Sequence, residues 1–144
     1  MHYHSIDIRA TDDLQKLMAT IAETYDRLDG CVAAAGIQKV TPALEYGKED
    51  VENMLDVNFT AAFLTAQEAG KQMIRYNTPG SIVLVGSISG QIANRGLYSP
   101  IYNSSKAAII QLARNLAMEW GQHKIRVNAL CPGHVSLIPS MHRC

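Results

Sequence analysis

Three stretches of the chain carry apolar side chains at steps of three and four residues. That spacing places the apolar side chains on one face of a helix. Helices are therefore predicted at residues 12 to 28, 49 to 76 and 101 to 121. The last two stretches have apolar or small residues on more than one side, which predicts that both sides of each helix are covered.

Four shorter apolar segments lie between and around these helices, and strands are predicted at residues 3 to 8, 31 to 35, 81 to 86 and 125 to 131. The third is a continuous apolar, β-branched run, which is typical of a strand buried on both faces in a parallel sheet. Strands and helices alternate throughout, which predicts an α/β fold with a parallel sheet and right-handed crossovers.

Ligands of parallel α/β sheets bind just beyond the carboxyl ends of the strands. Gly36, the loop at residues 87 to 90 and the Pro132-Gly133 turn all follow directly after a predicted strand. The binding site is therefore expected among these three segments.

The length of 144 residues suits one domain, and 13 basic residues balance 13 acidic ones. This neutral balance argues against nucleic acid or an anionic membrane as partner. We find no apolar run long enough to span a bilayer and expect no signal peptide. The three cysteines are an odd number without short pairing, which predicts reduced thiols in a cytoplasmic protein.

Several common motifs are missing from the sequence. It contains no G-x-G-x-x-G dinucleotide fingerprint, no P-loop and no G-x-S-x-G nucleophile elbow. His2 with His4, and His142 with Cys144, have ligand-like spacing, but they lie at the chain ends and we predict no metal site.

Tyr102 and Lys106 are four residues apart at the start of a predicted helix and therefore share a face. Ser89 lies thirteen residues earlier, in the loop after the buried strand, where it can meet them. A phenol has a pKa near 10, so it is a poor acid or base at pH 7. Lowering this pKa to about 7 takes about 4 kcal/mol, which an adjacent ammonium can help to supply. The alternative is an ordinary Tyr and Lys on a solvated helix face.

Three motifs occur in order: Ser81-Ile-Val-Leu-Val-Gly-Ser-Ile-Ser89-Gly90, Tyr102-Asn-Ser-Ser-Lys106-Ala-Ala and Arg126-Val-Asn-Ala-Leu-Cys-Pro132-Gly133. Together they resemble the short-chain dehydrogenase/reductase family over residues 3 to 137. The resemblance implies a Rossmann-like, doubly wound parallel sheet. It also implies that Tyr102 is the catalytic acid/base, that Lys106 holds the nicotinamide ribose and lowers the Tyr pKa, that Ser89 orients the substrate, and that Asn58 holds a water for proton relay.

The same resemblance implies the cofactor contacts. It places Asp7 beside the adenine and Gly36 near the adenine ribose, and it places Pro132, Gly133 and Val135 along the nicotinamide. Ala34 stands where the family has an Asn that helps to hold the cofactor. The segments 87 to 97 and 111 to 120 look like the ketose and polyol (sorbose reductase-like) branch, which implies NADP, or otherwise NAD, as cofactor.

The sequence departs from the family at both ends, and residues 1 to 144 are expected to form one partial NAD(P)-binding domain. The N-terminal strand-helix-strand-helix unit with its Gly-rich loop is missing, which predicts a bare apolar edge on the strand at 31 to 35. The substrate-capping helices and last strand are missing as well, and Leu137 stands where a Thr is usual.

Three functions remain open. The first is a reductase that moves a hydride between a nicotinamide cofactor and a small carbonyl or alcohol substrate. The second is a catalytically inactive, truncated chain acting at most as an association module, with a homo-oligomer formed through helices 49 to 76 and 101 to 121. The third is an epimerase or dehydratase that uses the same Tyr and Lys.

Overall fold

The computed structural model describes residues 2–133. Its strands are β1 (Gly30–Ala33), β2 (Ser81–Val85) and β3 (Arg126–Leu130). Its helices, including short 3₁₀ and π segments labelled η, are α1 (Thr11–Tyr25), η1 (Ala43–Glu45), α2 (Lys48–Leu55), η2 (Asp56–Thr60), α3 (Ala61–Arg75), η3 (Ile88–Gly90), α4 (Pro100–Trp120) and η4 (Gly121–His123). No helix among these residues is long and apolar enough to cross a membrane.

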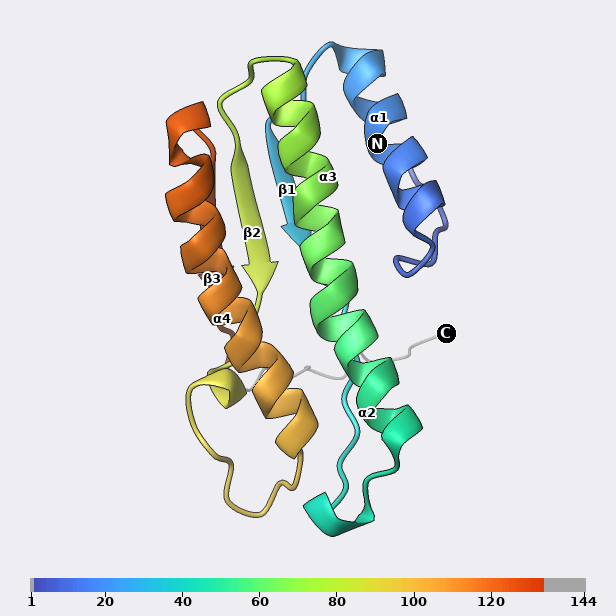
Figure 1. Cartoon of the computed structure of the whole chain (residues 1–144), viewed down its shortest axis with the longest axis vertical. Coiled ribbons are helices and arrows are strands. Elements are labelled where there is room, and N and C mark those ends of the chain that lie inside the picture. Colours follow the sequence, from blue (N-terminus) through green and yellow to red (C-terminus); the bar gives the residue numbers. More distant parts are fainter. Residues whose placement is uncertain (1, 134–144) are drawn as a thin grey trace, which may run out of the picture.

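The three strands form one parallel sheet in the order β1-β2-β3. Ile82 at the centre pairs with Cys31 on one side and with Val127 on the other. Helices α3 and α4 lie side by side across one face of the sheet, and α1 packs beside α3 (Figure 1). The predicted parallel α/β fold is confirmed.

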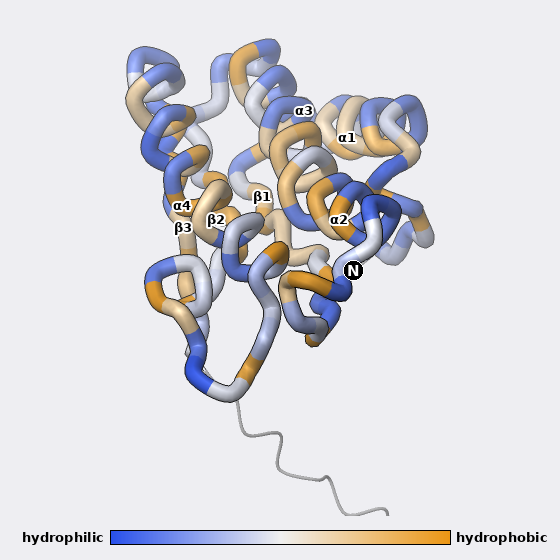
Figure 2. Tube along the Cα trace, turned by 60° about the horizontal axis from the view of Figure 1, so that its bottom comes forward, coloured by the Kyte–Doolittle hydropathy of each residue, from blue (hydrophilic) through white to orange (hydrophobic). Residues whose placement is uncertain are grey.

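Small residues let α3 approach the sheet closely. Its inner face carries mainly alanines, and the apolar core comprises Ala33, Ala62, Ala66, Ala69, Met73, Ile82, Leu84, Ile109, Ala113, Leu116, Ile125 and Val127. A Cβ on Gly70 of α3 would lie 3.2 Å from the Trp120 ring, so the indole at the end of α4 packs directly on α3. Apolar and polar residues interleave along every helix (Figure 2), as one-sided burial requires.

The opposite face of the sheet is only partly covered. Ile82 and Leu84 point into the core and are fully buried, whereas Val83 and Val85 are half-buried. Val32 on β1 is 64% exposed. The prediction that residues 81 to 86 are buried on both faces is therefore wrong for this chain, because the described helices that pack on the strands leave this face open.

Residues 3 to 8 do not form the predicted strand. A strand needs a hydrogen-bonded neighbour, and an apolar gap of about 220 Å³, lined by Ile8, Val32 and Thr65 among others, separates this segment from β1. Within residues 2–133, β1 therefore forms an open edge of the sheet, as predicted.

The predicted helix at 49 to 76 is interrupted. A π-helical segment, η2, separates α2 from α3 and contains Asn58. Wide turns of this kind are rare and occur frequently at functional sites. Nothing in the apolar spacing of this stretch distinguishes such a turn from ordinary α-helix.

The segment η3 packs closely on α4 at Gly90. A Cβ there would lie 2.6 Å from the Lys106 carbonyl carbon and 2.7 Å from the Ala107 nitrogen, and backbone cannot move aside cheaply. We expect Gly90→Ala to lower the free energy of unfolding by about 1–3 kcal/mol in urea titrations. Gly121→Ala is the matched control, because nothing lies within 4 Å of its Cβ. Equal stability of the two variants would contradict this packing.

Candidate active site

Lys106 is a buried cation at the end of the sheet. It lies in the second turn of α4, its side chain is almost fully buried, and its Nζ donates a hydrogen bond to the Val85 carbonyl oxygen at 2.7 Å. The same nitrogen lies 5.7 Å from the centre of the Tyr102 ring. Burial lowers the pKa of Lys106. The predicted pairing of Tyr102 with Lys106 on one helix face is thus present, at the carboxyl end of β2.

Asn58 holds the loop that follows β1. Its Oδ1 accepts from the Ile37 nitrogen at 2.8 Å, and its Nδ2 donates to the Ile37 carbonyl oxygen and to Ser105 Oγ. Ser105 Oγ in turn donates to the Tyr102 carbonyl oxygen at 2.7 Å. The buried amide therefore connects η2, the loop after β1 and the first turn of α4.

Gly36 lies where these parts converge. A Cβ at this position would stand 3.3 Å from Lys106 Nζ and 3.4 Å from Asn58 Oδ1. Sequence analysis placed Gly36, Asn58 and Lys106 in one site, and the structure brings all three together.

Ser89 lies apart from this group. It does not line the cleft around Tyr102, and its Oγ accepts a hydrogen bond from Asn94 Nδ2 at 2.7 Å. The neighbouring Ser87 does line that cleft, and its Oγ accepts from the Ser89 nitrogen. Sequence reasoning missed Ser87, although it follows β2 more closely than Ser89 does.

The cleft has a volume of about 350 Å³. It is lined by Ala34, Gly36, Ile37, Gln38, Val85, Gly86, Ser87, Tyr102, Lys106, Pro132 and Gly133. Four of the predicted cofactor-binding positions, Ala34, Gly36, Pro132 and Gly133, thus border one cavity together with Tyr102 and Lys106, at the carboxyl ends of the strands. Val135 and Leu137 lie outside the described residues.

A second hollow of about 590 Å³ adjoins the cleft, since both are lined by Gly36 and Ile37. Asp7 borders this second hollow, together with Arg9 and with Asn53 of α2. Asp7, the predicted adenine contact, therefore borders the second hollow, whereas Pro132 and Gly133 border the cleft. Sequence analysis did not single out Arg9, Asn53 or Gln38, because isolated polar residues in loops carry no periodic signal.

Ala34 is exposed at the mouth of the cleft. Replacement of an Asn by Ala at this position therefore leaves its neighbourhood open to water, rather than leaving buried groups without partners. Among residues 2–133, no group of three or more His, Cys, Asp and Glu side chains is arranged to hold a metal ion.

The sequence pattern of the short chain dehydrogenase family matches residues 1–142 of this chain. The chain belongs to the short-chain dehydrogenase family. A D-arabinitol 2-dehydrogenase of Candida albicans is 43% identical over 72% of the chain and 37% of its own length. An NADH-dependent L-xylulose reductase of Ambrosiozyma monospora is 36% identical over 94% of the chain and 50% of its own length.

Solved structures of this family superimpose closely on the chain. A short-chain type dehydrogenase/reductase from Mycobacterium marinum gives a TM-score of 0.86 at 33% identity, covering 89% of this chain and 52% of its own. 4-Hydroxyisoleucine dehydrogenase complexed with NADH gives a TM-score of 0.80 at 32% identity, and the match covers 89% of this chain and 56% of that structure's chain. ElxO with NADP bound gives a TM-score of 0.85 at 28% identity, and the match covers 92% of this chain and 52% of that structure's chain. The chain therefore spans about half the length of the short-chain dehydrogenases that it matches.

The lowered pKa of Lys106 predicts a pH-dependent stability. Between this pKa and the ordinary value of 10.5, the folded state binds fewer protons than the unfolded state, so the free energy of unfolding should rise with pH. Urea unfolding between pH 7 and 10.5 should show this rise in wild type relative to Lys106→Met. The free energy of unfolding should rise by less than roughly 1.4 kcal/mol per pH unit, the slope for a difference of one full proton between the two states. The slope is smaller because the cleft is open to water.

Lys16→Met removes an exposed lysine and serves as the control for loss of charge. Its stability should follow that of wild type across the same pH range. A constant difference between wild type and Lys106→Met at every pH would contradict the assigned burial of the ammonium.

Proposed function

We propose that this chain carries the catalytic half of an NAD(P)-dependent short-chain oxidoreductase that interconverts a carbonyl and an alcohol. The observation that carries the proposal is the placement of Tyr102, Lys106, Gly36 and Pro132 around one cleft at the strand ends. This is where open parallel sheets bind their ligands.

The residues present fit the two ends of a dinucleotide. Gly36 presents bare backbone beside Lys106, in a space that a side chain would fill, so a flat or bulky ligand group can approach closely there. When bound, a nicotinamide cofactor supplies or accepts the hydride. Lys106 would hold the adjoining ribose, Pro132 and Gly133 would border the nicotinamide, and Asp7 would contact the adenine.

Lys106 has three N–H donors and the Val85 carbonyl oxygen takes one of them. Two donors therefore remain for ribose hydroxyl groups. Lys106 Nζ lies 5.7 Å from the centre of the Tyr102 ring, and both side chains border the same cleft. Tyr102 would donate its phenolic proton to the substrate oxygen in reduction and recover it in oxidation.

We further propose a ketose or polyol as substrate. The relatives named as acting on D-arabinitol and L-xylulose support this class. Relatives bound to NADH and to NADP support either form of the cofactor.

A second candidate function is an association module without catalytic activity. The open edge of β1 and the 64% exposed Val32 favour it, because unpaired strand edges recruit further strands. The helices α2, α3 and α4, expected from the sequence to join copies of the chain, would supply contacts in addition to the β1 edge. Cofactor binding separates the two functions, since only the oxidoreductase requires it.

We expect NADH or NADPH to bind saturably to the purified chain. Binding is measured by the fluorescence of the reduced nicotinamide and by the thermal stability of the protein. Trp120 is a poor reporter, because fourteen helical residues place it about 21 Å along α4 from Lys106. Cofactor at 100 times its Kd should stabilise the fold by about 2.7 kcal/mol. Lys106→Met should weaken binding, whereas the surface variant Lys16→Met should not.

Tyr102→Phe should retain cofactor binding and lower any carbonyl reduction about 100-fold or more, because it removes the transferable proton. Assays with ketoses and polyols measure this loss. Failure of a folded chain to bind either cofactor at millimolar concentration would overturn the oxidoreductase proposal for this chain and leave the association module.

A further inference from the structure

Gln38 is an exposed residue bordering the cleft, and its backbone is held on both sides. On one side, the Asn58 side chain accepts from the Ile37 nitrogen at 2.8 Å and donates to the Ile37 carbonyl oxygen at 2.9 Å. On the other side, the Tyr46 hydroxyl donates to the Lys39 carbonyl oxygen at 2.6 Å. These contacts fix the place of Gln38 in the loop after β1, although loops are commonly the mobile parts of a fold.

The side-chain amide of Gln38 is anchored as well. Its Nε2 donates to Ser99 Oγ at 3.1 Å, and Ser99 is only 2% exposed. Within residues 2–133, no hydrogen-bond donor contacts Gln38 Oε1. One end of the amide is therefore held by a buried hydroxyl, and the other end is free to bind a ligand in the cleft that Gln38 lines together with Tyr102.

Attachment of one loop to the other does not account for this side-chain contact. The Thr41 backbone nitrogen donates to the Tyr98 carbonyl oxygen at 2.8 Å, and this bond already joins the loop after β1 to the loop before α4. A polar side chain at Gln38 is not needed for that purpose. Small-molecule sites place a few oriented polar groups on their walls to select a ligand, and the anchored amide is such a group.

The order of residues along α4 indicates which ligand the amide meets. Ser99 directly precedes α4, and Tyr102 and Lys106 follow in its first two turns. At about 1.5 Å of rise per residue, Ser99 lies roughly 4.5 Å before Tyr102, and Lys106 lies roughly 6 Å after it. Lys106 is the residue proposed to hold the cofactor ribose. The Gln38 amide, held at Ser99, therefore lies on the other side of Tyr102, where the part of a substrate next to its reacting oxygen extends.

We propose that Gln38, anchored by Ser99, is a specificity-determining residue whose amide binds a hydroxyl group on the carbon next to the substrate carbonyl. The site then prefers a hydroxy ketone to the same ketone without the hydroxyl, which would leave the amide without a partner. Either end of the amide can make this contact, because a hydroxyl group both donates and accepts. The inference rests on the proposed function and adds the residue that reads the substrate.

1-Hydroxy-2-pentanone and 2-pentanone test the proposal, because they differ by one hydroxyl group alone. Binding is measured by NMR titration of the intact, isotope-labelled chain. We expect wild type to bind the hydroxy ketone about five- to tenfold more tightly, as one neutral hydrogen bond provides. Gln38→Met keeps the length of the side chain without its polar group, and it should reduce the preference to within about twofold. The side-chain amide signal that this variant loses should shift in wild type with the hydroxy ketone only.

Two further variants separate the anchored amide from other causes. Ser99→Ala keeps Gln38 but removes the hydroxyl that holds it, and it should lose most of the preference. Gln15→Met is the matched control, because Gln15 is an exposed glutamine on α1 and does not border the cleft. This control should retain the full preference.

The outcomes distinguish this proposal from the oxidoreductase function. If NADH or NADPH binds but wild type does not prefer the hydroxy ketone, or if Gln38→Met keeps the preference, the role of Gln38 is overturned and the oxidoreductase proposal stands. If the preference depends on Gln38 while neither cofactor binds, the hydroxyl site stands and the oxidoreductase proposal falls. Full preference in Ser99→Ala overturns the anchoring by Ser99. Failure of folded wild type to bind either ketone overturns the assignment of Gln38 to a substrate site.

Discussion

The hydrogen bond from Lys106 Nζ to the Val85 carbonyl oxygen is the contact on which the site depends. A buried ammonium is costly unless it is hydrogen-bonded, so this contact fixes both the side chain and the start of α4 against the end of β2. Tyr102 is then held one turn away on the same face. Gly36 completes the arrangement, because a Cβ at this position would stand 3.3 Å from that ammonium and crowd it.

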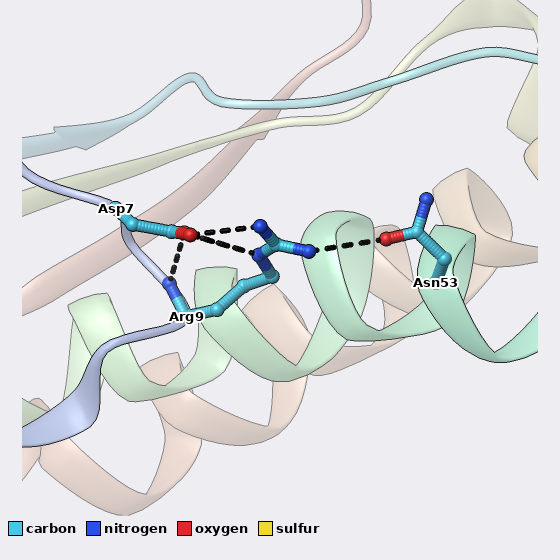
Figure 3. Close-up of polar contacts among 3 residues, drawn as sticks. All are labelled: Asp7, Arg9 and Asn53. Carbon is cyan, nitrogen blue, oxygen red and sulfur yellow. Dashed lines mark hydrogen bonds and ion pairs between the residues drawn. The ribbon is translucent and has the colours of Figure 1, made fainter.

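Separate hydrogen-bond networks hold different parts of the site in place. Asn58 joins η2, the loop after β1 and the first turn of α4 through four hydrogen bonds, its own three and that of Ser105. Separate hydrogen bonds hold the neighbouring loops, from Asn94 to Ser89 and from Gln38 to Ser99. Arg9 joins the segment that carries Asp7 to α2, where it donates to Asn53 (Figure 3). Three local hydrogen-bond networks therefore surround one core.

Particular residues show how far sequence reasoning reaches. The continuous run in β2 predicted a parallel strand correctly, but it also predicted burial on both faces, and Val83 and Val85 are only half-buried. A strand's composition reports the environment that suits it, not whether the described part of the chain supplies that environment. Residues 3 to 8 do not form the predicted strand for the same reason, because a strand needs a neighbouring strand with which to form hydrogen bonds. Ser89 was expected at the cleft, but its hydroxyl is held by Asn94 and Ser87 lines the cleft instead.

The sequence by itself determined the three parallel strands, the helices between them and the four-residue spacing that places Tyr102 and Lys106 on one face, because helix and strand periodicity are local properties of the backbone. Only the tertiary structure decided the π-helical turn at Asn58, the burial of Lys106 on Val85 and the clasp of Asp7 by Arg9 and Asn53. These features depend on contacts between residues that are distant along the chain. Their energies arise from burial and hydrogen-bond geometry, which no spacing of residues encodes.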